Sequence, residues 1–259
     1  MDELDRLKQI LARILSSKPS RLGRHPASKR SPKKQAELDF WRGLYGEITE
    51  KPQIADISAV DSSEKAENFN LTDEQWIALK PERRLFEVSK ALSFPRYKSD
   101  LMIGPNELTD KCVLDLGCGP MGALAWFNAK FRVGVDELIS DYSRIGYPLQ
   151  AHPILYVDGV AENLPFSNSQ FDVVISVNAL DHVENFEAAI SEIHRIVKRE
   201  GKIFASINYQ HKATTTEPIL LSDNRVESAF NPYFKFTKIK SETTEYGYSK
   251  NCYHCQALK

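Results

Sequence analysis

The stretch VLDLGCGPMGAL, residues 113–124, decides the fold. It starts as an apolar run broken by one acid, which is typical of a buried strand, and then turns through glycines at positions 117, 119 and 122. Glycine tolerates positive φ and lets the backbone approach a ligand closely. The residues after the turn favour a helix, whose free N–H groups would attract a carboxylate or phosphate. We therefore predict a strand, a ligand-binding turn and a helix over 121–129.

Strand-like and helix-like segments alternate from residue 111 onward. The predicted strands are 111–116, 131–136, 154–158, 171–177 and 202–208, and the predicted helices are 121–129, 139–146, 186–198 and 217–229. This alternation predicts an α/β fold with a parallel sheet covered on both faces. Two final strands, 234–239 and 252–258, lack a helix between them and should pair antiparallel. In such a sheet the ligand lies beyond the carboxyl ends of the strands.

Two further motifs follow the glycine stretch at suitable distances. VGVD at 133–136 is a short strand ending in an acid, and AENLPF at 161–166 leads into FDVVIS at 171–176. The set resembles class I S-adenosylmethionine (SAM)-dependent methyltransferases. With NALDHV at 178–183 it is similar to the small-molecule enzymes grouped with ubiquinone and menaquinone biosynthesis. The resemblance covers about residues 100–210 and implies a methyltransferase with SAM as cofactor, a Rossmann-like sheet whose last strand is antiparallel, and a SAM-binding domain over 101–259.

The resemblance also implies roles for individual residues. The turn should carry the methionine part of SAM, with Asp115 near its ammonium group. Asp136 should accept both ribose hydroxyls, because a carboxylate offers two acceptor oxygens. The expected cofactor-binding residues are Asp115, Leu116, Gly117, Cys118, Gly119, Asp136, Glu137, Val160, Ala161 and Asn178.

One position departs from the family pattern. Related enzymes commonly place an acid before the AENLPF segment to bind the adenine amino group, and here that residue is Val160. Asp158 could replace it only if the loop were displaced. Otherwise adenine would depend on the backbone of Ala161 and on apolar contacts with Leu138 and Leu164.

Methyl transfer is an in-line displacement that depends on alignment, and a general base near neutral pH would help an acidic acceptor. His182, just after the fourth strand, is the first candidate, although it could equally cap or pack the following helix. Asp181 would orient it or face solvent. Tyr209 and His211, past the fifth strand, are the other candidate catalytic residues.

Residues 35–100 read as a helical, aromatic extension, which in this family often forms a lid that shapes the acceptor pocket. Thr72 should cap a helix with Gln75 at its third position. Arg96 and Tyr97 are the best lid candidates, since a guanidinium could bind the methionine carboxylate. An apolar helical face is expected from Phe40, Trp41, Leu44, Tyr45 and Ile48, for which core packing is the alternative.

Residues 1–34 form a third region. An amphipathic helix is expected over 2–16, which could pack on this domain or mediate self-association or partner contact. Residues 18–34 are basic and rich in Pro and Ser, typical of a flexible linker. Residues 1–34 hold ten Lys/Arg and three Asp/Glu, a net +7, so the rest carries −8 of the total −1. A phosphate-binding arm is the alternative, but no aromatics are interleaved, which argues against nucleic acid.

Other features narrow the function. No apolar run is long enough to span a membrane and no signal peptide is visible, so we expect a cytoplasmic protein. No metal is expected, because a single CxxC at 252–255 falls short of four ligands. The [DNS]PP[YF] box of nucleobase amino methylation and a Pro-Cys nucleophile are both missing after the fourth strand. We expect methyl transfer to O or N of a small-molecule or saccharide-like acceptor. The alternatives are a non-catalytic SAM-fold module and an enzyme that methylates RNA or protein.

Overall fold

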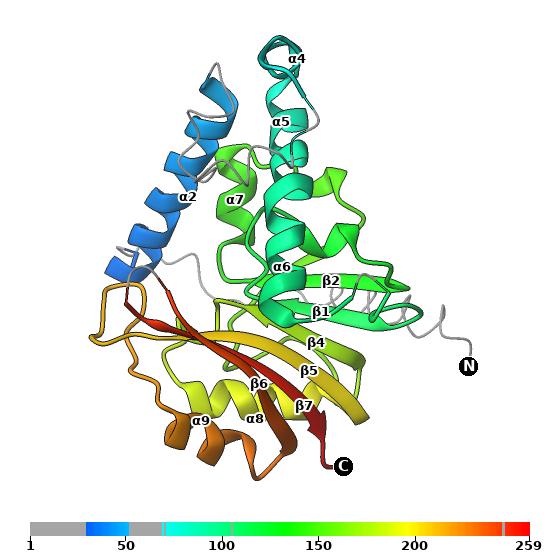
Figure 1. Ribbon diagram of the computed structural model, residues 1–259, viewed down its shortest axis with the longest axis vertical. Helices are drawn as coiled ribbons and strands as arrows, with labels where there is room; N and C mark the ends of the chain where they lie inside the picture. Colours follow the sequence, from blue (N-terminus) through cyan, green and yellow to red (C-terminus); the bar gives the residue numbers. More distant parts are fainter. Residues whose placement is uncertain (1–29, 52–68, 70, 105, 245–246) are drawn as a thin grey trace, which may run out of the picture.

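A seven-stranded sheet forms the centre of the computed structural model, which describes residues 30–51, 69, 71–104, 106–244 and 247–259 (Figure 1). The strand order is β3-β2-β1-β4-β5-β7-β6. The strands are β1 Cys112–Leu116, β2 Phe131–Asp136, β3 Leu155–Asp158, β4 Phe171–Val177, β5 Val197–Tyr209, β6 Phe234–Thr243 and β7 Ser249–Ala257.

The pairing confirms the predicted mixed sheet. Strands β1 to β5 pair in parallel, whereas β7 lies antiparallel between β5 and β6. The β6–β7 connection contains no helix, and a short connection joins antiparallel strands. Strand β1 has β2 on one side and β4 on the other, so the order of the strands along the chain reverses direction at β1. A crevice for a ligand is expected at this switch point.

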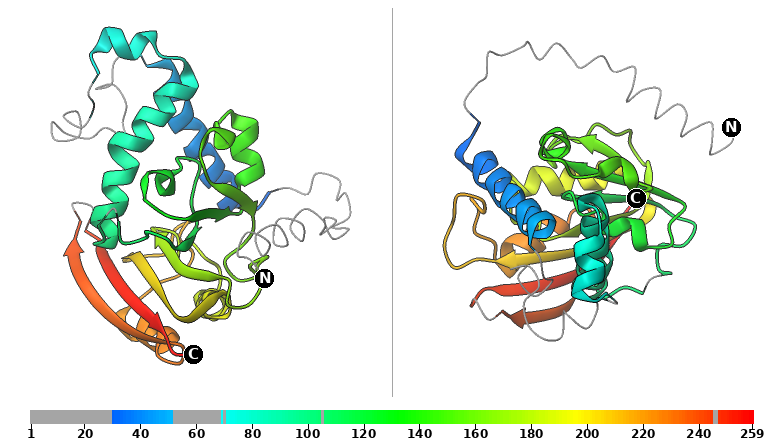
Figure 2. Two further views of the ribbon diagram at one scale, coloured as in Figure 1. Left: turned by 90° about the vertical axis from the view of Figure 1, so that its right-hand side faces the viewer. Right: turned by 90° about the horizontal axis from the view of Figure 1, so that it is seen from above.

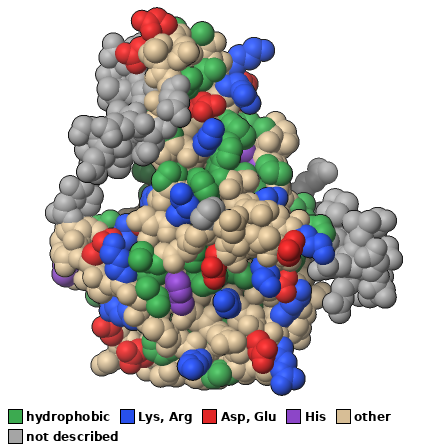
Figure 3. All heavy atoms as spheres, turned by 45° about the vertical axis from the view of Figure 1, so that its right-hand side comes forward, with side chains coloured by type: hydrophobic (Ala, Val, Ile, Leu, Met, Phe, Trp, Pro, Cys, Tyr) green, Lys and Arg blue, Asp and Glu red, His purple; other side chains and the backbone are tan. Residues whose placement is uncertain are grey.

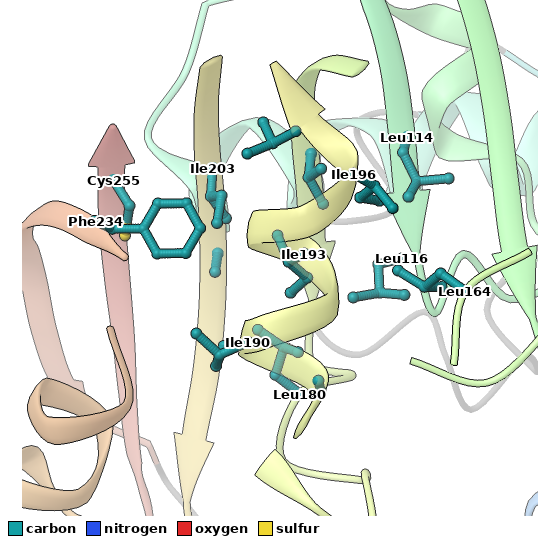
Figure 4. Close-up of a cluster of buried hydrophobic side chains, with 14 of the residues drawn as sticks. Leu114, Leu116, Leu164, Leu180, Ile190, Ile193, Ile196, Ile203, Phe234 and Cys255 are labelled. Atoms are coloured by element: carbon teal, nitrogen blue, oxygen red, sulfur yellow. The ribbon is translucent and has the colours of Figure 1, made fainter. Parts of the chain in front are cut away.

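Apolar side chains cover both faces of the sheet. On one face, α8 (Phe186–Ile196) buries three isoleucines, Ile190, Ile193 and Ile196, against the strands (Figure 4). Its N-terminus is capped by Asn185, which accepts from the Ala188 N–H. On the other face, α6 (Phe94–Leu101) packs against β4 and β5. Helices α7 (Ile139–Ile145) and α9 (Asp223–Phe230) complete the layers.

Two predicted helices are shorter than expected. The segment 121–129 holds only a 3-10 turn, Ala123–Trp126, preceded by Gly122 at φ +68° and followed by Phe127 in extended backbone. A Cβ on Gly122 would lie 2.3 Å from His152 Nδ1, so only glycine fits at this left-handed position. The helix predicted over 217–229 begins only at Asp223, because Ser222 caps it.

The N-terminal helices lie on the side of the sheet nearest α7, with α4 farthest from the strands (Figures 1 and 2). They are α2 (Pro32–Glu50), α4 (Asp73–Ala78), α5 (Pro81–Val88), a π-helical turn Ser89–Ser93, and α6. The capping box of Thr72 and Gln75 is confirmed. Phe40, by contrast, is 63% exposed, so its place on the apolar face of α2 was wrong.

The boundary expected at residue 34 is displaced. Helix α2 begins at Pro32, with Ser31 as its N-cap, because proline at the first helical position and a serine cap favour helix initiation. The predicted helix 2–16 and most of the basic linker lie outside the described residues. Among the described helices, none is both long and apolar enough to cross a bilayer.

Arg84 joins α2, α4 and α5. Its buried guanidinium donates to the carbonyls of Trp76 (3.1 Å), Thr49 (2.8 Å) and Ile77 (3.0 Å), and it stacks over the Trp76 ring at 5.3 Å. Carbonyls at helix C-termini lack partners within their own helix. Arg84 therefore satisfies the ends of α2 and α4 together.

We expect Arg84→Met to lower the free energy of unfolding by about 3 kcal/mol, because several buried carbonyls lose a charged donor. Urea denaturation followed by circular dichroism measures this change. The matched control is Arg83→Met, an exposed neighbour whose loss should cost within about 0.5 kcal/mol. Equal effects of the two substitutions would contradict this role of Arg84.

Candidate active site

The glycine turn after β1 is held against the end of β2. Gly117 has φ +69°, and a Cβ there would lie 2.2 Å from the Ala179 Cβ, so only glycine fits. The N–H groups of Gly117 and Cys118 donate to the Val135 carbonyl at 2.9 and 3.2 Å. Gly119 N–H donates to Asp136 Oδ2 at 3.1 Å. The expected helix N-terminus with free N–H groups is therefore absent at this turn, and a ligand would meet its other backbone atoms.

Asp136 stands at the end of β2, as predicted, and is partly buried. Its carboxylate accepts from Gly119 N–H, Leu138 N–H (3.0 Å) and Tyr142 Oη (3.2 Å). A carboxylate offers about four acceptor sites, so room is left for a further donor. Burial raises the pKa of Asp136 to about 6, although these three hydrogen bonds lower it.

Glu137, also predicted as a cofactor contact, is bound by two lysines of α2. Lys33 Nζ lies 3.0 Å from Oε1 and Lys34 Nζ lies 2.7 Å from Oε2. Burial alone would raise the pKa of Glu137, but the hydrogen bonds from Lys34 and Lys33 outweigh it and lower this pKa. The carboxylate of Glu137 thus anchors α2 to the sheet.

Asp115 is buried at the end of β1, where it faces Tyr97 of α6. The Tyr97 hydroxyl lies 3.5 Å from Asp115 Oδ1. Burial raises the pKa of Asp115 to about 8; the hydrogen bond from Tyr97 lowers this pKa and the nearby Asp136 raises it, so neither reverses the effect of burial. Arg96 does not join this pair: its side chain is 56% exposed and bonds Asp100 at 3.3 Å.

The loop after β3 orders the neighbouring loop after β4. Glu162 Oε1 accepts from the N–H groups of Glu184 (2.8 Å) and Asn185 (3.1 Å). Val160 is 39% exposed and Ala161 packs at the core edge. Asp158 is engaged elsewhere, because its two oxygens accept from Ser140 N–H and Oγ. 

Leu138 and Leu164, expected beside adenine, are both buried. With Asp158 bound to Ser140, no carboxylate of the loop after β3 takes the place of the family acid at Val160. The backbone of Ala161 is what this loop offers to an adenine amino group.

His182 lies at the end of β4 among three carboxylates. Its Nδ1 lies 3.5 Å from Glu37 Oε1, and its Nε2 lies 3.7 Å from Glu217 Oε1 and 3.9 Å from Asp181 Oδ2. Burial would lower the pKa of His182, but these acids outweigh it and raise that pKa. Asp181 is buried and beside His182, so the alternative that it faces solvent was wrong.

Asn178 immediately follows β4 in the left-handed region, at φ +52°. Its Nδ2 lies 3.4 Å from His182 Nε2, and its Oδ1 accepts from Asn208 Nδ2. The structure thus brings Asn178 and His182 together.

The other two catalytic candidates lie with different partners. The Tyr209 hydroxyl shares a hydrogen bond with the Tyr253 hydroxyl, within reach of Lys238 and Asp223. Exposed His211 bonds the Gly247 carbonyl in the β6–β7 connection. Neither contacts the carboxylates around His182, because β7 and its loop engage the side chains that follow β5.

Helix α2 covers the strand ends, and the roles of its Lys33 and Glu37 were not predicted from the sequence. Trp41 lies against the glycine turn, with its Cζ2 3.1 Å from an ideal Cβ on Gly119. Lys33, Glu37 and Trp41 are four residues apart, so they share one face of the helix. That spacing, after the Ser-Pro start, was the available signal. Glu217 had no such signal, because a loop brings it to His182.

Polar atoms without partners mark this edge of the sheet as a binding site. Among the described residues, Asp181 Oδ1 and Oδ2, Ser206 Oγ and Asn208 Oδ1 are buried and lack hydrogen bonds. Buried polar groups in proteins are almost always paired, so these atoms indicate a polar ligand. The residues fit SAM: the turn at 116–119 approaches without side chains at its glycines, and Asp136 retains acceptor capacity for the ribose.

Comparisons with known proteins agree with this geometry. Residues 114–205 match the family described as "Methyltransferase domain". The chain is 26% identical over 102 residues to the methyltransferase YcgJ of Bacillus subtilis, covering 38% of this chain and 40% of that protein. It is 26% identical over 161 residues to a demethylmenaquinone methyltransferase of Oceanobacillus iheyensis, covering 58% and 63%. These alignments therefore span less than two thirds of either relative.

A solved structure described as a putative sarcosine dimethylglycine methyltransferase from Galdieria sulphuraria aligns with a TM-score of 0.53 at 12% identity. The alignment covers 66% of this chain and 87% of that one. At this identity the likeness concerns the fold, and the neighbour supports a Rossmann-like methyltransferase sheet. Residues 114–205 thus match a methyltransferase domain, and the strand order and the solved neighbour show a Rossmann-like methyltransferase fold.

Proposed function

We propose that the protein transfers the methyl group of SAM to an oxygen or nitrogen atom of a small-molecule acceptor. The observation that carries this proposal is the joint placement of the glycine turn and Asp136 at the switch point, with His182 across it at the end of β4. When bound, SAM supplies an electrophilic methyl group on a sulfonium. The protein's own groups then have to bind SAM and the acceptor, align the two, and accept the proton that the acceptor loses.

Binding and alignment fall to residues at the strand ends. The backbone at 116–119 carries the methionine part, and Asp136 holds the ribose with its remaining acceptor capacity. Asn178, held by Asn208, presents polar atoms toward the same edge. Positioning of the reacting groups is the main contribution that such a displacement requires.

Proton transfer is assigned to His182. Glu37 binds one ring nitrogen, so the other nitrogen is directed at the space between Asp181 and Glu217. A carboxylate that fixes the ring in this way strengthens it as a base. An acceptor whose hydroxyl or amine reaches this nitrogen would lose its proton there as the methyl group arrives.

A small acceptor is favoured over a polymer. Helix α2 lies over the strand ends, and the described end of the basic segment is neutralised by acids: Arg30 by Asp141 at 2.6 Å, and both lysines by Glu137. Charged side chains of both signs are interspersed on the face drawn in Figure 3. The two relatives with descriptive names act on, or are named for, small metabolites.

We expect micromolar binding of SAM and of its demethylated product by calorimetry, weakened about thirtyfold in Asp136→Ala because a hydrogen bond to a charged acceptor is lost. The control is Glu187→Ala on the exposed face of α8, which should bind like the wild type. Asp136→Asn, which keeps one acceptor oxygen, tests binding if the alanine variant unfolds. If the folded protein binds neither SAM nor its demethylated product, the enzymatic proposal fails and a non-catalytic module is the remaining alternative.

Affinity for SAM should fall about tenfold from pH 7 to pH 5. The pKa of Asp136 is about 6, so its carboxylate is protonated progressively below that pH and loses acceptor capacity. Calorimetry at several pH values checks this dependence. In Asp136→Asn the part of the slope due to this group should disappear, and an unchanged slope would contradict the assignment.

The lid role of α2 predicts a fluorescence signal. SAM should change tryptophan emission by altering the surroundings of Trp41, which contacts the glycine turn. The change should vanish in Trp41→Phe and persist in Trp126→Phe, whose indole bonds Ser89 away from the turn. Loss of the signal in Trp126→Phe instead would place the responding element elsewhere.

A further inference from the structure

Asp181, His182 and Glu217 meet at the carboxyl ends of β4 and β5, from loops separated in the sequence. We propose that these three side chains bind a divalent first-row cation, with Mn²⁺ or Zn²⁺ as the ions that suit them. The sequence alone suggested no metal site. Cation binding stands independently of methyl transfer, but its role beside the acceptor depends on the proposed function.

The ligand atoms are already close together. One atom from each side chain lies within 4.8 Å of the other two, and His182 Nε2 is 3.7 Å from Glu217 and 3.9 Å from Asp181. Bonds of about 2.0–2.2 Å to a shared ion place neighbouring ligands about 3–3.5 Å apart. The two His182 pairs would have to contract by less than about 1 Å, and the Asp181–Glu217 pair, whose ligand atoms lie within 4.8 Å, by up to about 1.8 Å.

Asp181 supplies the independent indication of a ligand. Its side chain is 2% exposed, and neither carboxylate oxygen accepts a hydrogen bond. A buried charge is normally paired or bound to a metal. His182 partly compensates for it at 3.9 Å, beyond hydrogen-bond range, so both oxygens stay available to an ion.

The surrounding residues orient the ligands as in known metal sites. A metal-binding histidine usually donates its other ring nitrogen to a carboxylate, and Glu37 lies 3.5 Å from His182 Nδ1. Glu217 is positioned by Gln210 Nε2 at 3.0 Å and Thr214 Oγ1 at 3.2 Å. Asn178 Nδ2, 3.4 Å from His182 Nε2, is a competing donor and would have to turn away, whereas Gln210 Nε2 would share Glu217 Oε1 with the ion.

The donor set indicates the kind of ion. Imidazole suits Zn²⁺ and related metals, and carboxylates suit Mn²⁺ as well, whereas Mg²⁺ and Ca²⁺ prefer oxygen ligands alone. Glu37, Asp181 and Glu217 carry three negative charges around one histidine, which a divalent cation would offset. Three protein ligands leave positions open for oxygen atoms of an acceptor, and such an ion would orient an oxygen-rich molecule at the end of β4. Because the ion would occupy His182 Nε2, it would replace His182 in the metal-bound protein as the group that promotes loss of the acceptor proton.

The test uses untagged full-length protein freed of metal with a chelator, in the absence of SAM. Mn²⁺ is titrated and followed by electron paramagnetic resonance, and Zn²⁺ by calorimetry. We expect one site per chain, weakened at least about a hundredfold in Asp181→Asn and in Glu217→Gln, and about tenfold in Glu37→Gln.

Cys252→Ser is the matched control, because it removes the alternative thiol ligand near His254 and should leave affinity unchanged. Circular dichroism checks that each variant is folded. Asp181→Asn should also raise the melting temperature of the metal-free protein, since it removes a buried charge without removing a hydrogen bond.

Folded wild type that binds neither ion at millimolar concentration would overturn the proposal, as would affinity that survives both ligand substitutions or is lost in Cys252→Ser. SAM binding, measured by calorimetry on the same preparation, is independent of metal binding, so it tests the proposed function separately from the metal site.

Discussion

The contact between the glycine turn and the end of β2 is the interaction on which the crevice depends. Three successive N–H groups, at residues 117–119, donate to the carbonyl of Val135 and the carboxylate of Asp136. The contact requires φ values open to glycine, and at Gly117 it also requires space that Ala179 leaves to a hydrogen atom alone. It aligns the ends of β1 and β2 side by side and orients Asp136.

The second constraint is the closure of the crevice by α2. Ion pairs from Lys33 and Lys34 to Glu137 and a hydrogen bond from the Tyr147 hydroxyl to the Trp41 carbonyl tie this helix to the β2–α7 region. Its Glu37 reaches across to His182 at the end of β4. The helix therefore connects the end of β2 with the end of β4. Partly buried ion pairs are screened less than exposed ones, so these contacts hold the helix in register over the site.

The end of β4 carries more buried charge than packing alone would require. Burial raises the pKa of Asp181 to about 6, even though the neighbouring His182 opposes this shift. Ser206 and Asn208 add unpartnered polar atoms to the same region. Such groups cost stability unless a ligand satisfies them, and proteins keep such costs mainly where binding or chemistry needs them.

The sequence by itself determined the sheet and the cofactor edge, because these depend on local patterns. Alternating apolar strands and helices, the glycines at 117 and 119, the acid at 136 and the Thr72 capping box all act over a few residues. The same local reasoning failed at 121–129, where Gly122 takes a left-handed conformation against His152 from a distant segment and only a 3-10 turn follows. It also placed Phe40 on the wrong face of its helix, since the docking of α2 decides which of its residues are covered.

Only the tertiary structure decided which side chains surround His182. Glu37 comes from α2 and Glu217 from the loop before α9, and no spacing in the chain links them to His182, whereas Asp181 is its neighbour in the sequence. It also separated Tyr209 and His211 from that cluster, because β7 and the β6–β7 connection supply them with other partners. Contacts between segments far apart in the chain depend on how the helices and loops pack, so local sequence patterns do not predict them.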